Sequence, residues 1–86
     1  MIQNKNNKKT QLIIISKLKK LVAIESEIHA IIPIEGYFEG NEINFCKAKM
    51  TKGQQLIIGE DYLFSLEHKG ISDRILIANL IKAKGL

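Results

Sequence analysis

Residues 52–74, KGQQLIIGEDYLFSLEHKGISDR, carry a glycine on each side of a short apolar run and then alternate aromatic with polar residues. In an extended chain Tyr62, Phe64 and Leu66 fall on one side, as in a strand with one buried face, and these side chains are predicted to enter the core. Residues 56–59, LIIG, are predicted to form a short strand that ends at Gly59, and residues 68–73, HKGISD, a loop. Short strands between glycine-containing turns are typical of a small β domain.

The preceding segment, residues 11–35, also alternates mostly with a period of two, with apolar residues at the even positions. Its isoleucines are β-branched and Pro33 lies inside the pattern, so the sequence favours strands over a helix. A turn near residues 25–27 would divide the segment into two strands. A helix over residues 16–32 remains an alternative, because it too would gather apolar residues on one side.

Residues 34–45, IEGYFEGNEINF, give the strongest hairpin signal, since two β-rich runs flank Gly40-Asn41. Alternation then assigns residues 41–50 to two faces. The predicted core face carries Cys46, Ala48 and Met50, and the predicted outer face carries Ile43, Phe45, Lys47 and Lys49. Residues 73–84 are expected to form a strand through their ILI run, with a helix after Ser72 as the alternative.

The basic residues are unevenly distributed along the 86-residue chain, whose formal net charge is +4. Residues 1–20 contain six lysines and no acidic residue, so residues 21–86 are slightly acidic. Residues 1–10 lack apolar periodicity and are expected to form a flexible basic arm that can attract phosphates. Residues 11–86 are expected to form a single small domain.

Catalytic and metal-binding signatures are not found in the sequence. Cys46, the single cysteine, excludes an intrachain disulfide and is expected to be an inert core residue. His29 and His68 have no partner at the spacing of a zinc site or a catalytic pair. The sequence therefore predicts a binding protein that is not an enzyme and needs no cofactor. Without an apolar stretch of about 20 residues, a cytoplasmic rather than membrane location is expected.

Lys52-Gly53, Gly59 and Gly70 punctuate residues 43–84 in a way that resembles OB-fold proteins such as the bacterial single-stranded DNA-binding proteins. The resemblance implies a mostly β fold, a five-stranded OB-like barrel. Two features depart from that family: TKGQQ, residues 51–55, leaves no room for the usual helix between the third and fourth strands, and the chain has no tryptophan.

The resemblance also implies a site in which exposed aromatic residues stack on bases and lysines follow the phosphates. The matching positions on the outer face and in the adjacent loops are Tyr37, Phe45, Lys47, Lys49, Lys52, Lys69 and Arg74. The alternative for the same residues is structural: Tyr37 and Phe45 would cover one end of the barrel, and the lysines would keep the surface soluble.

Two functions follow as hypotheses. The first is binding of single-stranded DNA or RNA, two partners that the sequence does not distinguish. The second is a protein-interaction or assembly subunit, for example of a plasmid, phage or secretion apparatus, in which exposed strand edges pair with a protein partner or with another copy of the chain.

Overall fold

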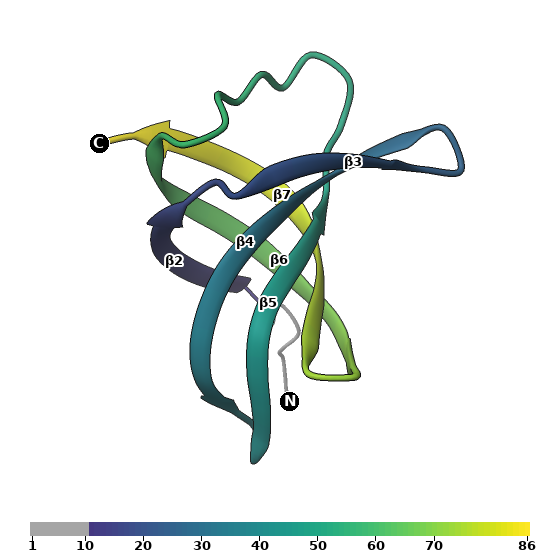
Figure 1. Cartoon of the computed structure of the whole chain (residues 1–86), viewed down its shortest axis with the longest axis vertical. Coiled ribbons are helices and arrows are strands. Elements are labelled where there is room, and N and C mark those ends of the chain that lie inside the picture. Colours follow the sequence, from purple (N-terminus) through teal and green to yellow (C-terminus); the bar gives the residue numbers. More distant parts are fainter. Residues whose placement is uncertain (1–10) are drawn as a thin grey trace, which may run out of the picture.

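The computed structural model describes residues 11–86, which form six β-strands and no helix (Figure 1). The predicted basic arm, residues 1–10, lies outside the described residues. The mostly β prediction is confirmed, as is the preference for strands over helices in residues 11–32 and 73–84. The strands are β2 (Gln11–Lys17), β3 (Lys20–Ile24), β4 (Glu27–Phe38), β5 (Asn41–Lys49), β6 (Asp61–Ser72) and β7 (Ile75–Gly85).

The six strands of residues 11–86 form one sheet in the order β2-β6-β7-β5-β4-β3. Every neighbouring pair is antiparallel except β5 and β7, which are parallel. The two edge strands, β2 and β3, are adjacent in the chain and are separated only by Leu18 and Lys19. The sheet must therefore curl strongly enough to bring its two edges near one another.

Between β2 and β4, hydrogen bonding is local and no ladder forms. Ser16 Oγ donates to the Pro33 carbonyl oxygen at 2.7 Å, but β2 and β4 share no strand register within the described residues. The sheet is thus strongly curled without being closed into a barrel. The predicted five-stranded OB-like barrel is not confirmed, because residues 11–86 form six strands and the edge strands β2 and β3 do not pair with each other.

Hairpin turns of two residues join three antiparallel pairs in the described chain. In Glu25-Ser26, Glu39-Gly40 and Asp73-Arg74, both residues have positive φ, the conformation of type I′ turns that matches the twist of the flanking strands. The turn predicted near residues 25–27 is confirmed. The hairpin of residues 34–45 is also confirmed, although its turn is one residue earlier than Gly40-Asn41.

Two local predictions are wrong. Residues 68–73 are not a loop, because β6 continues to Ser72 and the turn to β7 needs only two residues. LIIG, residues 56–59, is not a strand, because no neighbouring strand pairs with it. It belongs to the connection between β5 and β6, in which the side chains of Ile57 and Ile58 are exposed.

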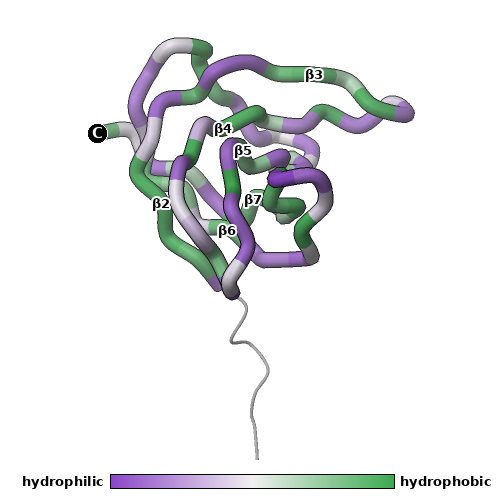
Figure 2. The backbone as a smooth tube through the Cα atoms, turned by 60° about the horizontal axis from the view of Figure 1, so that its bottom comes forward, coloured by the Kyte–Doolittle hydropathy of each residue, from purple (hydrophilic) through white to green (hydrophobic). Residues whose placement is uncertain are grey.

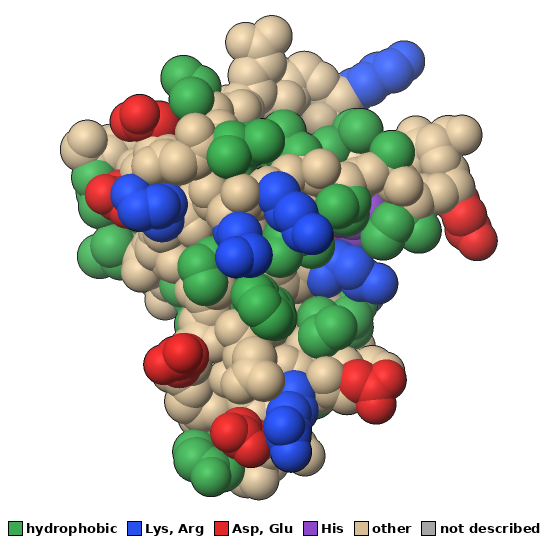
Figure 3. Space-filling model, in the orientation of Figure 1, with side chains coloured by type: hydrophobic (Ala, Val, Ile, Leu, Met, Phe, Trp, Pro, Cys, Tyr) green, Lys and Arg blue, Asp and Glu red, His purple; other side chains and the backbone are tan. Residues whose placement is uncertain are grey.

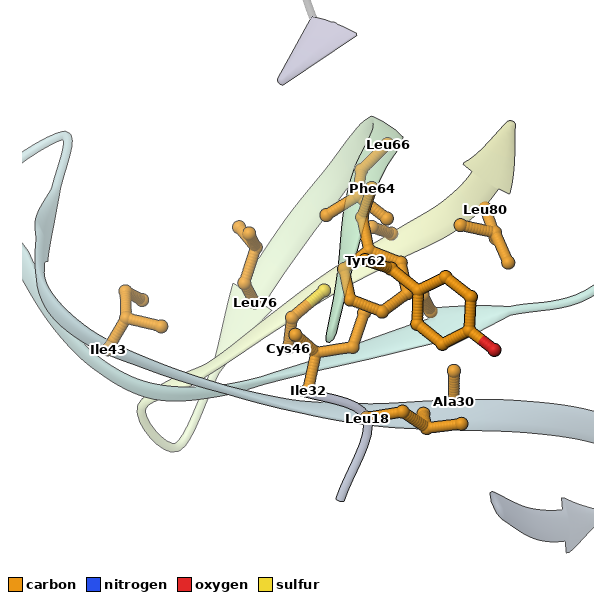
Figure 4. Packing of buried hydrophobic residues seen from close by; sticks show 12 residues of the cluster. Leu18, Ala30, Ile32, Ile43, Cys46, Tyr62, Phe64, Leu66, Leu76 and Leu80 are labelled. Atoms are coloured by element: carbon orange, nitrogen blue, oxygen red, sulfur yellow. The ribbon is translucent and has the colours of Figure 1, made fainter. Parts of the chain in front are cut away.

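The core lies on the inner face of the curled sheet. Tyr62, Phe64 and Leu66 on β6 are buried, as predicted, and point toward Ile32 and Cys46 on the opposite side (Figure 4). The other buried members of the cluster are Leu18, Ala30, Ile43, Ala48, Leu76, Ala78 and Leu80. The partly buried residues Phe38, also predicted to be core, and Met50 pack against the cluster.

A β-bulge changes the faces of β5 at one point and corrects the prediction for Ile43. Pro33 pairs with Phe45 and Gly36 pairs with Ile43, so two residues of β4 lie opposite the single Asn44 of β5. The alternation therefore shifts between Ile43 and Phe45. Ile43 is 3% exposed and belongs to the core, whereas Phe45 remains on the outer face.

The bulge predicts unequal costs for truncating its two apolar neighbours. Ile43→Ala removes a buried side chain and should lower the free energy of unfolding by about 2–5 kcal/mol. Phe45→Ala removes a partly exposed side chain and should lower it by about 1 kcal/mol or less. Urea unfolding of both variants measures the difference, and a larger cost for Phe45→Ala would contradict the face assignment.

Candidate nucleic-acid interface

Strand β5 presents Phe45, Lys47 and Lys49 on its solvent side, while Cys46 and Ala48 point into the core. Phe45 is 36% exposed, and the two lysines are half-buried. An aromatic ring and two cationic side chains thus follow one another at alternate positions along a single strand. This row is the centre of the candidate interface.

The flanking strands β4 and β7 surround this row with mostly apolar residues. Pro33 and Ile75 pair with Phe45, Ile31 and Ile77 pair with Lys47, and His29 and Asn79 pair with Lys49. We call these nine residues the outer face. Lys20 on β3 extends it, because Lys20 pairs with Ile31.

Figure 3 shows this arrangement on the molecular surface, where lysine and arginine side chains are interspersed with hydrophobic ones across the middle of the view. Acidic side chains lie toward the margins of the same view. Half-buried lysines in such a surface can lay their methylene groups on apolar neighbours and keep the ammonium group in water. The outer face therefore combines apolar area with positive charge.

The two lysines of β5 differ in their electrostatic partners. Lys49 Nζ lies 3.5 Å from Glu27 Oε2 in an exposed ion pair, which contributes little to stability and can be exchanged for another anion at low cost. No ion pair of Lys47 is found within residues 11–86. Lys47 is thus the cation at the centre of the outer face that is available to a phosphate.

A groove lies beyond the end of β5, lined mainly by residues from the inner side of the β3–β4 hairpin. It lies between the β3–β4 hairpin and the loop that follows β5, and Lys49 and Lys52 both line it. Its apolar lining includes Leu21, Ile28 and Met50. The predicted site residue Lys52 therefore shares this groove with Lys49 and is not part of the outer face.

Two predicted site residues, Tyr37 and Lys69, lie away from the outer face, whereas Arg74 lies next to its Phe45 end, where the Arg74 carbonyl accepts from the Asn44 amide at 2.8 Å. Tyr37 is 77% exposed, but it lies beyond the bulge and pairs with Glu42 near the tip of the β4–β5 hairpin. Arg74 occupies the β6–β7 turn, where its Nε is 3.7 Å from Glu42 Oε1. Lys69 is the exposed residue of a bulge on β6, a strand that is separated from β5 by β7.

The sequence interpretation missed the neighbours that complete the outer face. Ile31 and His29 alternate with Pro33 at odd positions of β4, a pattern visible in the sequence. Their position beside Lys47 and Lys49, and that of Ile75 and Ile77, depends on strand order and register. The parallel pairing of β5 with β7 brings together residues about 30 positions apart, for which alternation gives no signal.

The two histidines lie in separate surroundings in the described part of the chain. His29 Nδ1 lies 3.2 Å from the carbonyl oxygen of Glu27, and the His68 ring packs edge-on against Phe38 with a centroid separation of 4.8 Å. Within residues 11–86 no group of three histidine, cysteine or acidic side chains is arranged to hold a metal ion. No helix in the same residues is long and apolar enough to cross a membrane.

Comparison with known proteins finds no matching family model, no matching curated protein and no matching solved structure. Fold and surface chemistry are therefore the basis for a functional assignment.

Cys46 lies directly beneath the outer face and is fully buried. Burial raises the pKa of its thiol from 9.0 to about 12, because the apolar core disfavours the thiolate. The thiolate is the reactive form of cysteine. Cys46 is therefore protonated and unreactive in the folded protein at neutral pH.

Cys46 should accordingly resist thiol reagents such as Ellman's reagent at pH 8 until the domain opens. Since the unfolded thiol ionises near pH 9 and the folded one near pH 12, the stability linked to this group should decline between these values. Labelling rates measured across a urea series should follow the unfolded fraction. Rapid labelling of the folded protein would contradict the burial of Cys46.

Proposed function

We propose that this chain is a single-stranded nucleic-acid-binding module of the OB type, in which the outer face contacts bases and phosphates. The observation that carries the proposal is the row Phe45, Lys47, Lys49 on β5, set between apolar residues of β4 and β7. Proteins that bind single strands combine aromatic stacking platforms with cations that follow the backbone. In this proposal the chain binds and does not catalyse, and it needs no cofactor.

The strand order supports the OB assignment. An OB-fold is a five-stranded, partly open Greek-key barrel in which the second and third strands bind oligonucleotides. If β2 and β3 are taken as the two halves of one bent first strand, β4 and β5 become the second and third strands. The outer face then lies where an OB module binds its ligand.

The chemistry of the outer face favours contacts that tolerate any base sequence. Backbone donors and acceptors of β5 are used in ladders with β4 and β7, so they are not free to recognise base edges. Phe45 can stack on a base of any kind, and Lys47 and Lys20 can pair with phosphates on either side. Lys17 is less suited to this role, because it already bonds Asp61 and the Gly59 carbonyl.

The proposal is tested by fluorescence anisotropy of labelled oligothymidine with the full chain and with a chain that lacks residues 1–10. Both proteins should bind, and the shorter one should keep most of its affinity at physiological salt. Loss of binding together with residues 1–10 would show that the lysines of that segment, and not the outer face, carry the interaction.

Phe45→Ala should weaken oligothymidine binding about 5- to 150-fold, because one stacked base contributes about 1–3 kcal/mol. Circular dichroism should show that the variant remains folded. Ile13→Ala is the matched control, since Ile13 is an exposed apolar residue on β2, away from the outer face. Equal losses in both variants would argue against a stacking role for Phe45.

Lys47→Ala should lower the salt dependence of binding as well as the affinity. Removing one phosphate contact to a single strand should reduce the slope of log affinity against log salt by about 0.7. The control is Lys82→Ala, an exposed lysine on the far part of β7. A slope that changes in the control but not in Lys47→Ala would place the phosphate path elsewhere.

A role as a protein-interaction or assembly subunit is the second candidate. It is favoured by the open edge of β3 and by the exposed isoleucines of the β3–β4 hairpin. An open strand edge can pair with another chain through its free backbone groups. This role is compatible with nucleic-acid binding, because the edge and the centre of the outer face are different surfaces.

A further inference from the structure

The β3–β4 hairpin projects from the body of the molecule, and β3 forms its rim (Figures 1 and 2). β3 is the last strand in the sheet order, so only one of its sides is paired. Within residues 11–86, no backbone hydrogen bond joins residues 20–24 to any segment other than β4. The other side of β3 therefore carries backbone donors and acceptors without protein partners.

The projecting hairpin also exposes apolar side chains on both of its faces. Ile24 is 37% exposed on the outer side, and Ile28 is 44% exposed on the inner side. Folded proteins usually protect an edge strand with a proline, a bulge or charges along its length. β3 has neither a proline nor a bulge, and its only charged residue is Lys20, at one end.

We propose that β3 pairs antiparallel with β3 of a second copy, about a twofold axis that passes beside Val22. This register overlaps all five residues of β3, from Lys20 to Ile24. It is isologous, so each contact occurs twice. The two sheets then continue into one, with the inner faces on the same side.

Charge complementarity favours this register for a second copy. Residues of β3 directly opposite one another have numbers that sum to 44. Just beyond the two ends of the paired strands, Lys19 of one copy and Glu25 of the other then lie near each other with opposite charges. Lys20 of one copy lies opposite Ile24 of the other. Within that second copy Ile24 pairs with Glu27, so Lys20 and Glu27 carry opposite charges in the same row. A shift of two residues in either direction loses the opposition of Lys19 and Glu25 and shortens the ladder.

Apolar residues match in the same register. Leu21 of one copy lies opposite Ala23 of the other on the inner side, and the two Val22 side chains meet on the outer side. Across the joined sheet, Ala30 and Leu21 of one copy then lie in one row with Ala23 and Ile28 of the other, all on the inner side. Cross-strand apolar pairs and opposite charges of this kind stabilise antiparallel sheets.

Pairing through β3 would also join the two outer faces. His29 and Lys49 of each copy lie in the row of Val22, so the shared row runs from one Lys49 to the other. The surface for a long ligand would double without any change within either copy. The pairing itself rests on the edge of β3 and does not depend on nucleic-acid binding.

The test is sedimentation velocity of the full chain over a concentration series, without nucleic acid. The wild-type protein should sediment as a dimer that dissociates on dilution. Lys19→Glu and Glu25→Lys should each raise the dissociation constant roughly tenfold or more, because like charges then lie near each other at both ends. The double variant Lys19→Glu/Glu25→Lys restores opposite charges and should regain most of the affinity.

Lys84→Glu is the matched control, since it makes the same change of charge on β7 and should leave the dimer intact. Val22→Lys places two lysines face to face at the axis and should also dissociate the dimer, with circular dichroism to verify folding. A monomer at every concentration, dimers unaffected by the single variants, or no recovery in the double variant would each overturn the proposal. A monomer that captures an extended peptide would identify a different occupant of the edge and overturn it as well.

Discussion

The architecture depends on how Leu18 and Lys19 transfer the chain from one edge of the sheet to the other. Leu18 is fully buried, its amide donates to the Glu60 carbonyl at 3.0 Å, and its carbonyl accepts from the Gly59 amide at 2.9 Å. The Lys19 amide donates to the Ile31 carbonyl at 3.0 Å, at the start of the pairing with β4. Because both edges are held by one short link, the sheet has to curl, and its inner face encloses the core.

Curling separates the two faces of the central strands and leaves the proposed binding surface on the outside. Inner residues such as Cys46 and Ala48 are sealed in the core, while the alternate residues Phe45, Lys47 and Lys49 are left on the outside. The parallel contact between β5 and β7 adds Ile75 and Ile77 on one side of this row, and β4 adds Ile31 and Pro33 on the other. The result is a surface on which aromatic, apolar and cationic groups lie in close register.

Much of the fold could be predicted from alternation, because one-sided burial of a strand leaves a period of two. The strands in residues 11–32, the burial of Phe64 and the turn near residues 25–27 all follow from local sequence. Ile43 was assigned to the wrong face because a bulge shifts the alternation, and nothing within NEINF marks it. The same pattern identified the row of Phe45, Lys47 and Lys49, but its neighbours depend on register between distant segments.

The most direct test of the outer face as the binding surface is an NMR titration of the ¹⁵N-labelled full chain with unlabelled oligothymidine. The account predicts that the amides with the largest shifts cluster on β5 around residues 45–49 and on the paired segments 29–33 and 75–79. The amides of residues 81–85 on the far end of β7 should change little. Shifts confined to residues 1–10, or spread without relation to the outer face, would contradict the account.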